Sequence, residues 1–144
     1  MQNCIKRKHE PNSFFLHDTN QVFTEIDIKQ NETVIDLGCG LGLYSVEASQ
    51  RVGPSGQVYA LDLSKDCLSN LEELMTNEKI TNITTVLANI THPLPIEDDL
   101  ADICLLITVL HIPKVTIKAH ELAAEVKRIL KPAGRLVVID CYSK

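Results

Sequence analysis

Apolar residues along the chain fall alternately into short runs and into longer stretches with helical spacing. The stretches predict helices that start after Asp18, span 43–52, start after Ser64 and span 116–130. The short runs predict five strands, at Val34–Leu37, Val58–Leu61, Ile83–Ala88, Ile103–Leu110 and Leu136–Ile139. Because strands and helices alternate, the pattern predicts an α/β fold with a parallel, doubly wound sheet.

Turn signals separate these elements. Gly53-Pro54-Ser55-Gly56 predicts a tight turn, Pro93 and Pro95 predict a loop, and the segment 131–134 is expected to end the last helix before the fifth strand. Residues 1–17 are polar and are expected to form an irregular N-terminal arm. The length of 144 residues fits one hydrophobic core, so we expect residues 1–144 to form a single domain.

Composition excludes several classes of protein. The net charge of −5 gives no electrostatic footprint for nucleic acid. No apolar run approaches the roughly 20 residues that span a bilayer, and the basic cluster 6–8 is not followed by a secretory apolar segment. The five cysteines include no Cys-x-x-Cys pair, so neither a metal site nor a disulfide framework is expected. The sequence therefore predicts a cytoplasmic protein without nucleic acid or membrane as a partner.

The segment from Val34 to Gly42 is the most informative part of the chain. A β-branched run leads into Asp36 and then into three glycines at alternate positions, Gly38, Gly40 and Gly42. Such glycines permit positive φ and a close approach of backbone to a ligand, and the helix that follows directs its N-terminus toward the same point. A dinucleotide fingerprint would place its third glycine at position 43, which is leucine. Purely structural glycines in an unrelated α/β protein remain the alternative.

The pattern Asp36-x-Gly38-x-Gly40-x-Gly42 resembles motif I of the class I S-adenosylmethionine-dependent methyltransferases. This cofactor is cationic and carries no phosphate, so a carboxylate at its site is favourable. Asp62 ends the second predicted strand, where the resemblance implies a carboxylate on the ribose diol. The alternative for Asp62 is an acid that caps the helix after Ser64.

Two further segments carry the resemblance. Ala88-Asn89-Ile90 is similar to the family's Gly-Asp-Ala segment, which implies that Asn89 accepts from the adenine amino group and that the Ile90 N–H faces the ring. Asn89 replaces the family's acid, which removes the charge from that bond. Residues 130–140 resemble the family's Leu-Lys-Pro-Gly-Gly-x-Leu signature, with Ala133 in place of one glycine.

The resemblance implies S-adenosylmethionine as the cofactor and a small molecule as the methyl acceptor. His111 follows the fourth predicted strand and is the candidate general base, with lining of the pocket as the alternative. The Leu-His-Ile-Pro context of residues 110–113 is closest to enzymes of the ubiquinone/menaquinone-biosynthesis type, and no metal ligands are expected. The expected cofactor-binding residues are Asp36, Gly38, Cys39, Gly40, Gly42, Asp62, Leu63, Asn89, Ile90 and Thr108.

The resemblance also implies a Rossmann-like sheet of order 3-2-1-4-5 with helices on both faces. Members of the family continue past the fifth strand with a helix and two more strands, whereas this sequence stops at Lys144, so these C-terminal strands are expected to be absent. The strand Leu136–Ile139 would then be an apolar edge, which invites pairing into a homodimer. A cofactor-binding module or fragment without catalysis of its own remains the alternative to an active enzyme, while the glycine spacing disfavours a nicotinamide-dependent oxidoreductase.

Overall fold

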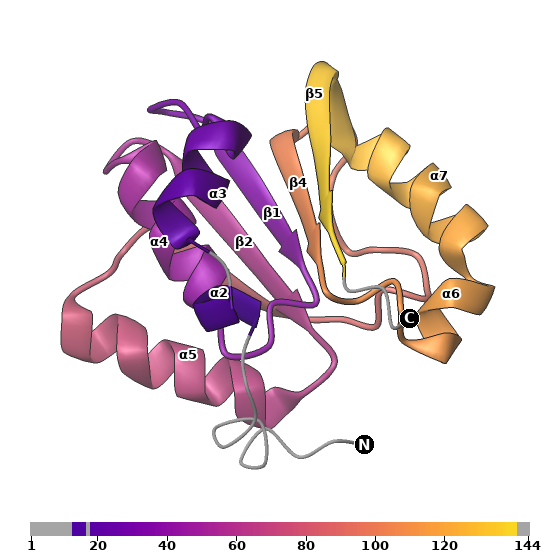
Figure 1. Cartoon of the computed structure of the whole chain (residues 1–144), viewed down its shortest axis with the longest axis horizontal. Helices are drawn as coiled ribbons and strands as arrows, with labels where there is room; N and C mark the ends of the chain where they lie inside the picture. Colours follow the sequence, from indigo (N-terminus) through magenta and orange to yellow (C-terminus); the bar gives the residue numbers. More distant parts are fainter. Residues whose placement is uncertain (1–12, 17, 141–144) are drawn as a thin grey trace.

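The computed structural model describes residues 13–16 and 18–140 (Figure 1). Helices and strands alternate over most of the chain, and the predicted span 43–52 agrees with the helix observed there. In chain order the elements are α2 (Ser13–Leu16), α3 (Thr19–Ile26), β1 (Thr33–Leu37), α4 (Leu43–Val52), β2 (Gln57–Asp62), α5 (Lys65–Glu78), β3 (Ile83–Leu87), β4 (Ala101–Ile107), α6 (Pro113–Ile117), α7 (Ala119–Ile129) and β5 (Leu130–Ile139).

The five strands form one parallel sheet in the order β3-β2-β1-β4-β5, as predicted. β1 lies at the centre, where Val34 pairs with Val58 of β2 on one side and with Ile103 of β4 on the other. All strands therefore end at the same edge of the sheet, which is where open α/β sheets present their ligand sites.

Helices cover both faces of this sheet, which confirms the doubly wound fold. On one face Phe23 of α3, Tyr44 of α4 and Leu71 of α5 pack against Val34, Val58 and Ile103. On the other face α7 packs its apolar side against Ile35 and Leu106. In Figure 1, α6 and α7 lie beside β4 and β5, and α4 and α5 lie toward the opposite side of the molecule.

Three predicted boundaries differ from the structure by more than two residues. β4 ends at Ile107 rather than Leu110, because Thr108 turns the chain into the left-handed region with φ 53°. The predicted helix 116–130 is two helices, since Pro113 starts α6 and the chain leaves helical geometry at Lys118, with φ −104° and ψ 14°. The segment 131–134 is not a separate turn but an irregularity inside β5, where the register with β4 shifts between Ala101 and Ile103.

The N-terminal part of the fold is also more ordered than expected. Residues 13–16 of the predicted irregular arm form the helical turn α2, whereas residues 1–12 and 17 lie outside the described residues. The predicted N-cap of α3 is confirmed, since Asp18 Oδ1 accepts from the Gln21 N–H at 3.2 Å. Within the described ranges, no helix is both long and apolar enough to cross a membrane.

One expectation about the cysteines is wrong. Cys67, at the start of α5, is fully buried and disulfide-bonded, whereas Cys104 of β4 is a buried free thiol. The spacing of cysteines along a sequence does not reveal which thiols meet in the fold.

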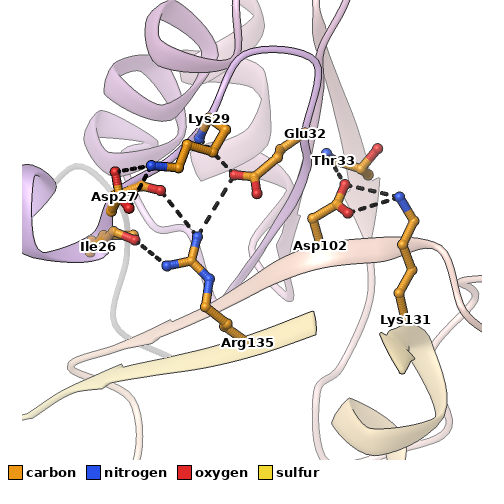
Figure 2. A network of polar contacts seen from close by, with 8 residues as sticks. All are labelled: Ile26, Asp27, Lys29, Glu32, Thr33, Asp102, Lys131 and Arg135. Carbon is orange, nitrogen blue, oxygen red and sulfur yellow. Dashed lines mark hydrogen bonds and ion pairs between the residues drawn. The ribbon is translucent and has the colours of Figure 1, made fainter. Parts of the chain in front are cut away.

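A polar network ties the sheet together at the amino ends of its strands (Figure 2). Arg135 of β5 donates to the carbonyl oxygens of Ile26 and Asp27, at 2.7 and 3.1 Å. Asp102 of β4 accepts from the Thr33 N–H at 2.8 Å and pairs with Lys131 at 2.9 Å. This network holds β5 and the end of α3 in place, and it leaves the opposite edge of the sheet for a site.

Candidate functional site

A cavity of about 560 Å³ lies at the carboxyl edge of the sheet, a volume suited to a small ligand. Its wall is made where β1, β2, β3 and β4 end, and α2 and α6 contribute at the rim. The residues that follow the four strand ends and line it include Gly38 after β1, Leu63 after β2, Ala88 after β3 and Thr108 after β4.

The turn after β1 requires its glycines. Gly38 has φ 78°, and a Cβ there would lie 2.7 Å from Val109 Cγ1. Gly42 has φ 77°, and a Cβ there would lie 2.6 Å from Leu71 Cδ1. Both positions therefore combine a left-handed backbone with no room for a side chain.

The amides of this turn are used differently from the sequence expectation. The N–H groups of Gly38 and Cys39 both donate to the Leu61 carbonyl at 2.8 Å, and the Gly40 N–H donates to Asp62 Oδ2 at 2.8 Å. These three donors hold the turn against β2 and are not directed at a ligand. The turn thus shapes the wall of the cavity, and these three N–H groups are not available to bind a ligand.

Asp36 is a buried carboxyl in the wall of the cavity. Asp36 is 2% exposed, and its Oδ2 accepts from the Ser45 hydroxyl at 2.6 Å. Burial raises the pKa of Asp36 to about 6, and the nearby Asp62 adds to the rise, while the Ser45 bond opposes it. A cation in the cavity would favour the ionised form of this group, which is the electrostatic character that an ammonium or sulfonium ligand needs.

Asp62 is held by two backbone bonds at the end of β2. Oδ2 accepts from the Gly40 N–H and Oδ1 accepts from the Ser64 N–H, each at 2.8 Å. The N-cap of α5 is Ser64, whose hydroxyl accepts from the Cys67 N–H at 3.3 Å, so Asp62 is not the capping residue of that helix, and its side chain lines the cavity. Each carboxylate oxygen keeps acceptor capacity beyond these bonds, so the geometry is compatible with a ribose diol as well.

Asn89 makes a tight turn after β3. Its Oδ1 accepts from both the Thr91 N–H at 3.0 Å and the Thr91 hydroxyl at 2.7 Å. These two bonds fill the two lone pairs of a carbonyl oxygen, so the side-chain NH₂ is the group left for a ligand. An acceptor role toward adenine requires the Thr91 hydroxyl to turn toward His92 Nδ1, which lies 3.1 Å away.

The loop that carries Asn89 and Ile90 is anchored by α7. Arg128 donates to the carbonyl oxygens of Leu94 and Ile96, at 3.0 and 2.7 Å, and pairs with Glu125. Glu125 in turn accepts from the Leu94 N–H at 2.7 Å. The side-chain bond to Arg128 lowers the pKa of Glu125, so the pair stays ionised and holds the loop over the sheet.

The turn after β4 brings His111 to the cavity. Thr108 is a β-branched residue at positive φ, a conformation that costs about 1–3 kcal/mol, and such strain is concentrated at functional sites. His111 Nδ1 lies 2.8 Å from Asp140 Oδ1. The sequence singled out His111, but it gave no signal that a carboxylate 29 positions away would reach it.

The structure brings almost all of the predicted site residues to this one cavity. Gly42 is the exception, because it packs against Leu71 behind the wall. Within the described ranges, no three His, Cys, Asp or Glu side chains gather as a metal site. Sequence reasoning missed several lining residues, because no motif marks them; they include Leu41, Leu43, Tyr44, Thr91, Ile112, Lys114 and Val115.

Comparison with known proteins identifies the family. Residues 28–144 match the methyltransferase domain family. The chain is 35% identical over 136 residues to the ubiquinone/menaquinone biosynthesis C-methyltransferase UbiE of Haemophilus ducreyi, which covers 92% of this chain and 50% of that protein. It is 29% identical over 109 residues to the arsenite methyltransferase of Halobacterium salinarum, covering 76% of this chain and 27% of that protein.

A solved structure agrees with these matches. The S-adenosylmethionine-dependent methyltransferase of Aquifex aeolicus superposes with a TM-score of 0.84 at 27% identity, over 97% of this chain and 73% of that one. The chain spans about half or less of the length of the curated relatives named above. The sheet order thus agrees with the one that the sequence predicted. The chain belongs to the class I S-adenosylmethionine-dependent methyltransferases, the family whose cofactor is S-adenosylmethionine.

Proposed function

We propose that this chain binds S-adenosylmethionine in the cavity at the carboxyl edge of the sheet and transfers its methyl group to a small molecule. The observation that carries the proposal is the joint presence of Asp36, the turn after β1 and Asp62 in one cavity wall. The buried carboxyl of Asp36 suits the cationic amino acid end of the cofactor, and Asp62 suits the ribose hydroxyls.

The proposed chemistry needs little from the protein besides placement. The sulfonium is already an activated leaving group, so holding the acceptor in line with the methyl carbon supplies much of the acceleration. The loop anchored by Arg128 would cover the adenine through Asn89 and Ile90. Thr108 and His111, at the end of β4, would then lie on the acceptor side of the cofactor.

A small-molecule acceptor is supported by the names of the relatives and by charge. The relatives are named for methylation of arsenite and for ubiquinone and menaquinone biosynthesis. The net charge of −5 does not favour a nucleic acid as the acceptor. A cytoplasmic location stays a prediction.

Calorimetric titration with S-adenosylhomocysteine, with NAD as the matched control ligand, tests the cofactor. We expect saturable binding of S-adenosylhomocysteine and none of NAD. Transfer of radiolabelled methyl groups to a panel of quinols, phenols, amines and arsenite then tests the acceptor class. Binding of NAD in place of S-adenosylhomocysteine would contradict the proposal at its first step.

A second candidate function is a cofactor-binding module that catalyses nothing by itself. It is favoured by the coverage of the relatives, since the chain matches only half of the Haemophilus protein. This candidate predicts normal binding of S-adenosylhomocysteine together with no methyl transfer to any member of the panel. The two measurements together therefore separate the candidates.

We also propose that two copies pair through β5. Leu136 and Val138 are 43% and 46% exposed on this edge strand. On its other face, Val137 and Ile139 border an apolar groove against α3. Sedimentation velocity is expected to show a dimer, and Val138→Lys is expected to give a folded monomer; a wild-type monomer at high concentration would refute the pairing.

A further inference from the structure

The turn after β4 holds a histidine whose position is fixed by a carboxylate from the end of β5. Asp140 Oδ1 lies 2.8 Å from the His111 ring nitrogen Nδ1, and Asp140 Oδ2 accepts from the His111 backbone N–H at 3.2 Å. Both oxygens of one carboxylate therefore contact the same residue. The Asp140 side chain is 13% exposed, whereas the His111 side chain is 51% exposed and lines the cavity.

The parallel register of the last two strands brings these residues together. Ile107 at the end of β4 pairs with Ile139 at the end of β5, and the Thr108 N–H donates to the Ile139 carbonyl at 2.6 Å. Asp140 directly follows the last residue of β5. The Ile112 N–H donates to the Val109 carbonyl at 3.1 Å and closes a turn. This turn brings His111 back toward Asp140.

The protonation of the ring follows from the partner. An ionised carboxylate accepts hydrogen bonds and cannot donate them, so the Nδ1 atom that faces Asp140 must carry a proton. In a neutral ring the other nitrogen, Nε2, is then unprotonated and basic. Asp140 thus selects one tautomer of His111 as well as one orientation.

We infer that Asp140 is a positioning residue that holds His111 as the base of the methyl transfer, an inference that rests on the proposed function. Nε2 takes the proton from an O–H, N–H or acidic C–H group of the acceptor. The electron pair of that bond forms the new bond to the methyl carbon of S-adenosylmethionine. The carbon–sulfur bond breaks with its electrons on sulfur, which gives S-adenosylhomocysteine and a protonated His111 that releases its proton to water.

The tautomer can be measured without any acceptor. In protein labelled with ¹⁵N-histidine at about pH 8, where a histidine ring is ordinarily neutral, we expect His111 to carry its proton on Nδ1. His120, which is exposed on α7, serves as the solvated reference with the proton on Nε2. Asp140→Ala should return His111 to the solvated pattern, and the His111→Gln spectrum assigns the signals. A wild-type His111 with its proton on Nε2, or a tautomer that Asp140→Ala leaves unchanged, would overturn the inference.

Kinetics with the best acceptor of the radiolabel panel tests the role of the base. We expect His111→Gln to lower kcat at least 100-fold with little change in KM for S-adenosylmethionine, and Asp140→Asn to retain more activity than Asp140→Ala. Unchanged kcat in His111→Gln would overturn the inference. If wild-type protein binds no S-adenosylhomocysteine, the proposed function fails, and the His111 tautomer still reports separately on the pair.

Discussion

Replacing Asp36 by asparagine should stabilise the protein and weaken its cofactor binding at the same time. Asparagine has nearly the shape of aspartate, and its oxygen can still accept from the Ser45 hydroxyl, which donates to Asp36 at 2.6 Å. What the change removes is a buried negative charge. The two effects therefore have one cause and opposite signs.

The size of the stability effect follows from the pKa. Burial raises the pKa of Asp36 from 3.8 to about 6, a rise of about two units, and each unit corresponds to about 1.4 kcal/mol. The folded state holds this proton more tightly than the unfolded state does, so the free energy of unfolding falls as the pH rises from about 4 to about 6 and is level above that. Ionised Asp36 thus costs about 3 kcal/mol at pH 7, which is the upper limit of what Asp36→Asn can recover.

Urea unfolding at pH 4 and pH 7 measures the effect. The gain in unfolding free energy from Asp36→Asn should be larger at pH 7 than at pH 4 by about 2 kcal/mol. Glu73→Gln, which removes a charge from the exposed side of α5, is the matched control and should show no such difference. If Asp36→Asn changed the free energy of unfolding by the same amount at both pH values, the reasoning would be refuted, because the buried carboxyl would then not be titrating in this range.

The same variant should bind S-adenosylhomocysteine more weakly. Loss of a charged partner for the ligand ammonium is worth about 1.5–3 kcal/mol, or roughly a 10- to 150-fold rise in Kd by calorimetry at pH 7. A Kd equal to that of the wild type would mean that Asp36 does not face the cation.

Three further predictions concern the walls of the site. Gly38→Ala should lower stability by about 2–4 kcal/mol in thermal unfolding, because φ is 78° and the new Cβ meets Val109 at 2.7 Å; Val109→Ala should relieve part of that loss. Asn89→Asp should tighten S-adenosylhomocysteine binding about three- to tenfold by calorimetry if this residue accepts from adenine, and weaker binding would show that its NH₂ donates instead. Arg128→Met should cost about 2–3 kcal/mol and speed hydrogen exchange in the loop after β3, whereas Lys127→Met on the exposed side of α7 should change neither.

The sequence predicted correctly those elements whose ends are set by neighbouring residues in the chain, such as glycines. The helix 43–52 was predicted with its observed bounds because a glycine stands on either side of it, at positive φ in both cases. The end of β4 was predicted wrongly because Val109 and Leu110 continue the apolar run. Apolar periodicity does not distinguish a strand from a buried turn, and the left-handed Thr108 has no signature in the sequence.

The contacts between distant residues were beyond sequence reasoning. Asn89 was identified by its position, but the engagement of its oxygen by Thr91 depends on the local turn that the chain adopts. Asp140 was identified only as the end of a signature, and its contact with His111 depends on the register of β4 and β5. Motifs thus located the cavity, while the hydrogen bonds that decide the chemistry had to come from the fold.

The two acids of the cavity wall are stabilised in different ways. This difference explains how the site can keep its shape without a ligand and still attract a cationic one. Asp62 accepts two backbone N–H bonds, from Gly40 and Ser64, so its negative charge is compensated within the protein and holds the turn in shape. Asp36 has one hydroxyl donor and is buried, so its charge is under-compensated, as the raised pKa reports. A cation that enters the cavity supplies the missing compensation at Asp36 without disturbing the bonds of Asp62. Cofactor binding should therefore stabilise the fold most at pH values where Asp36 is ionised, above about 6, and least near pH 4.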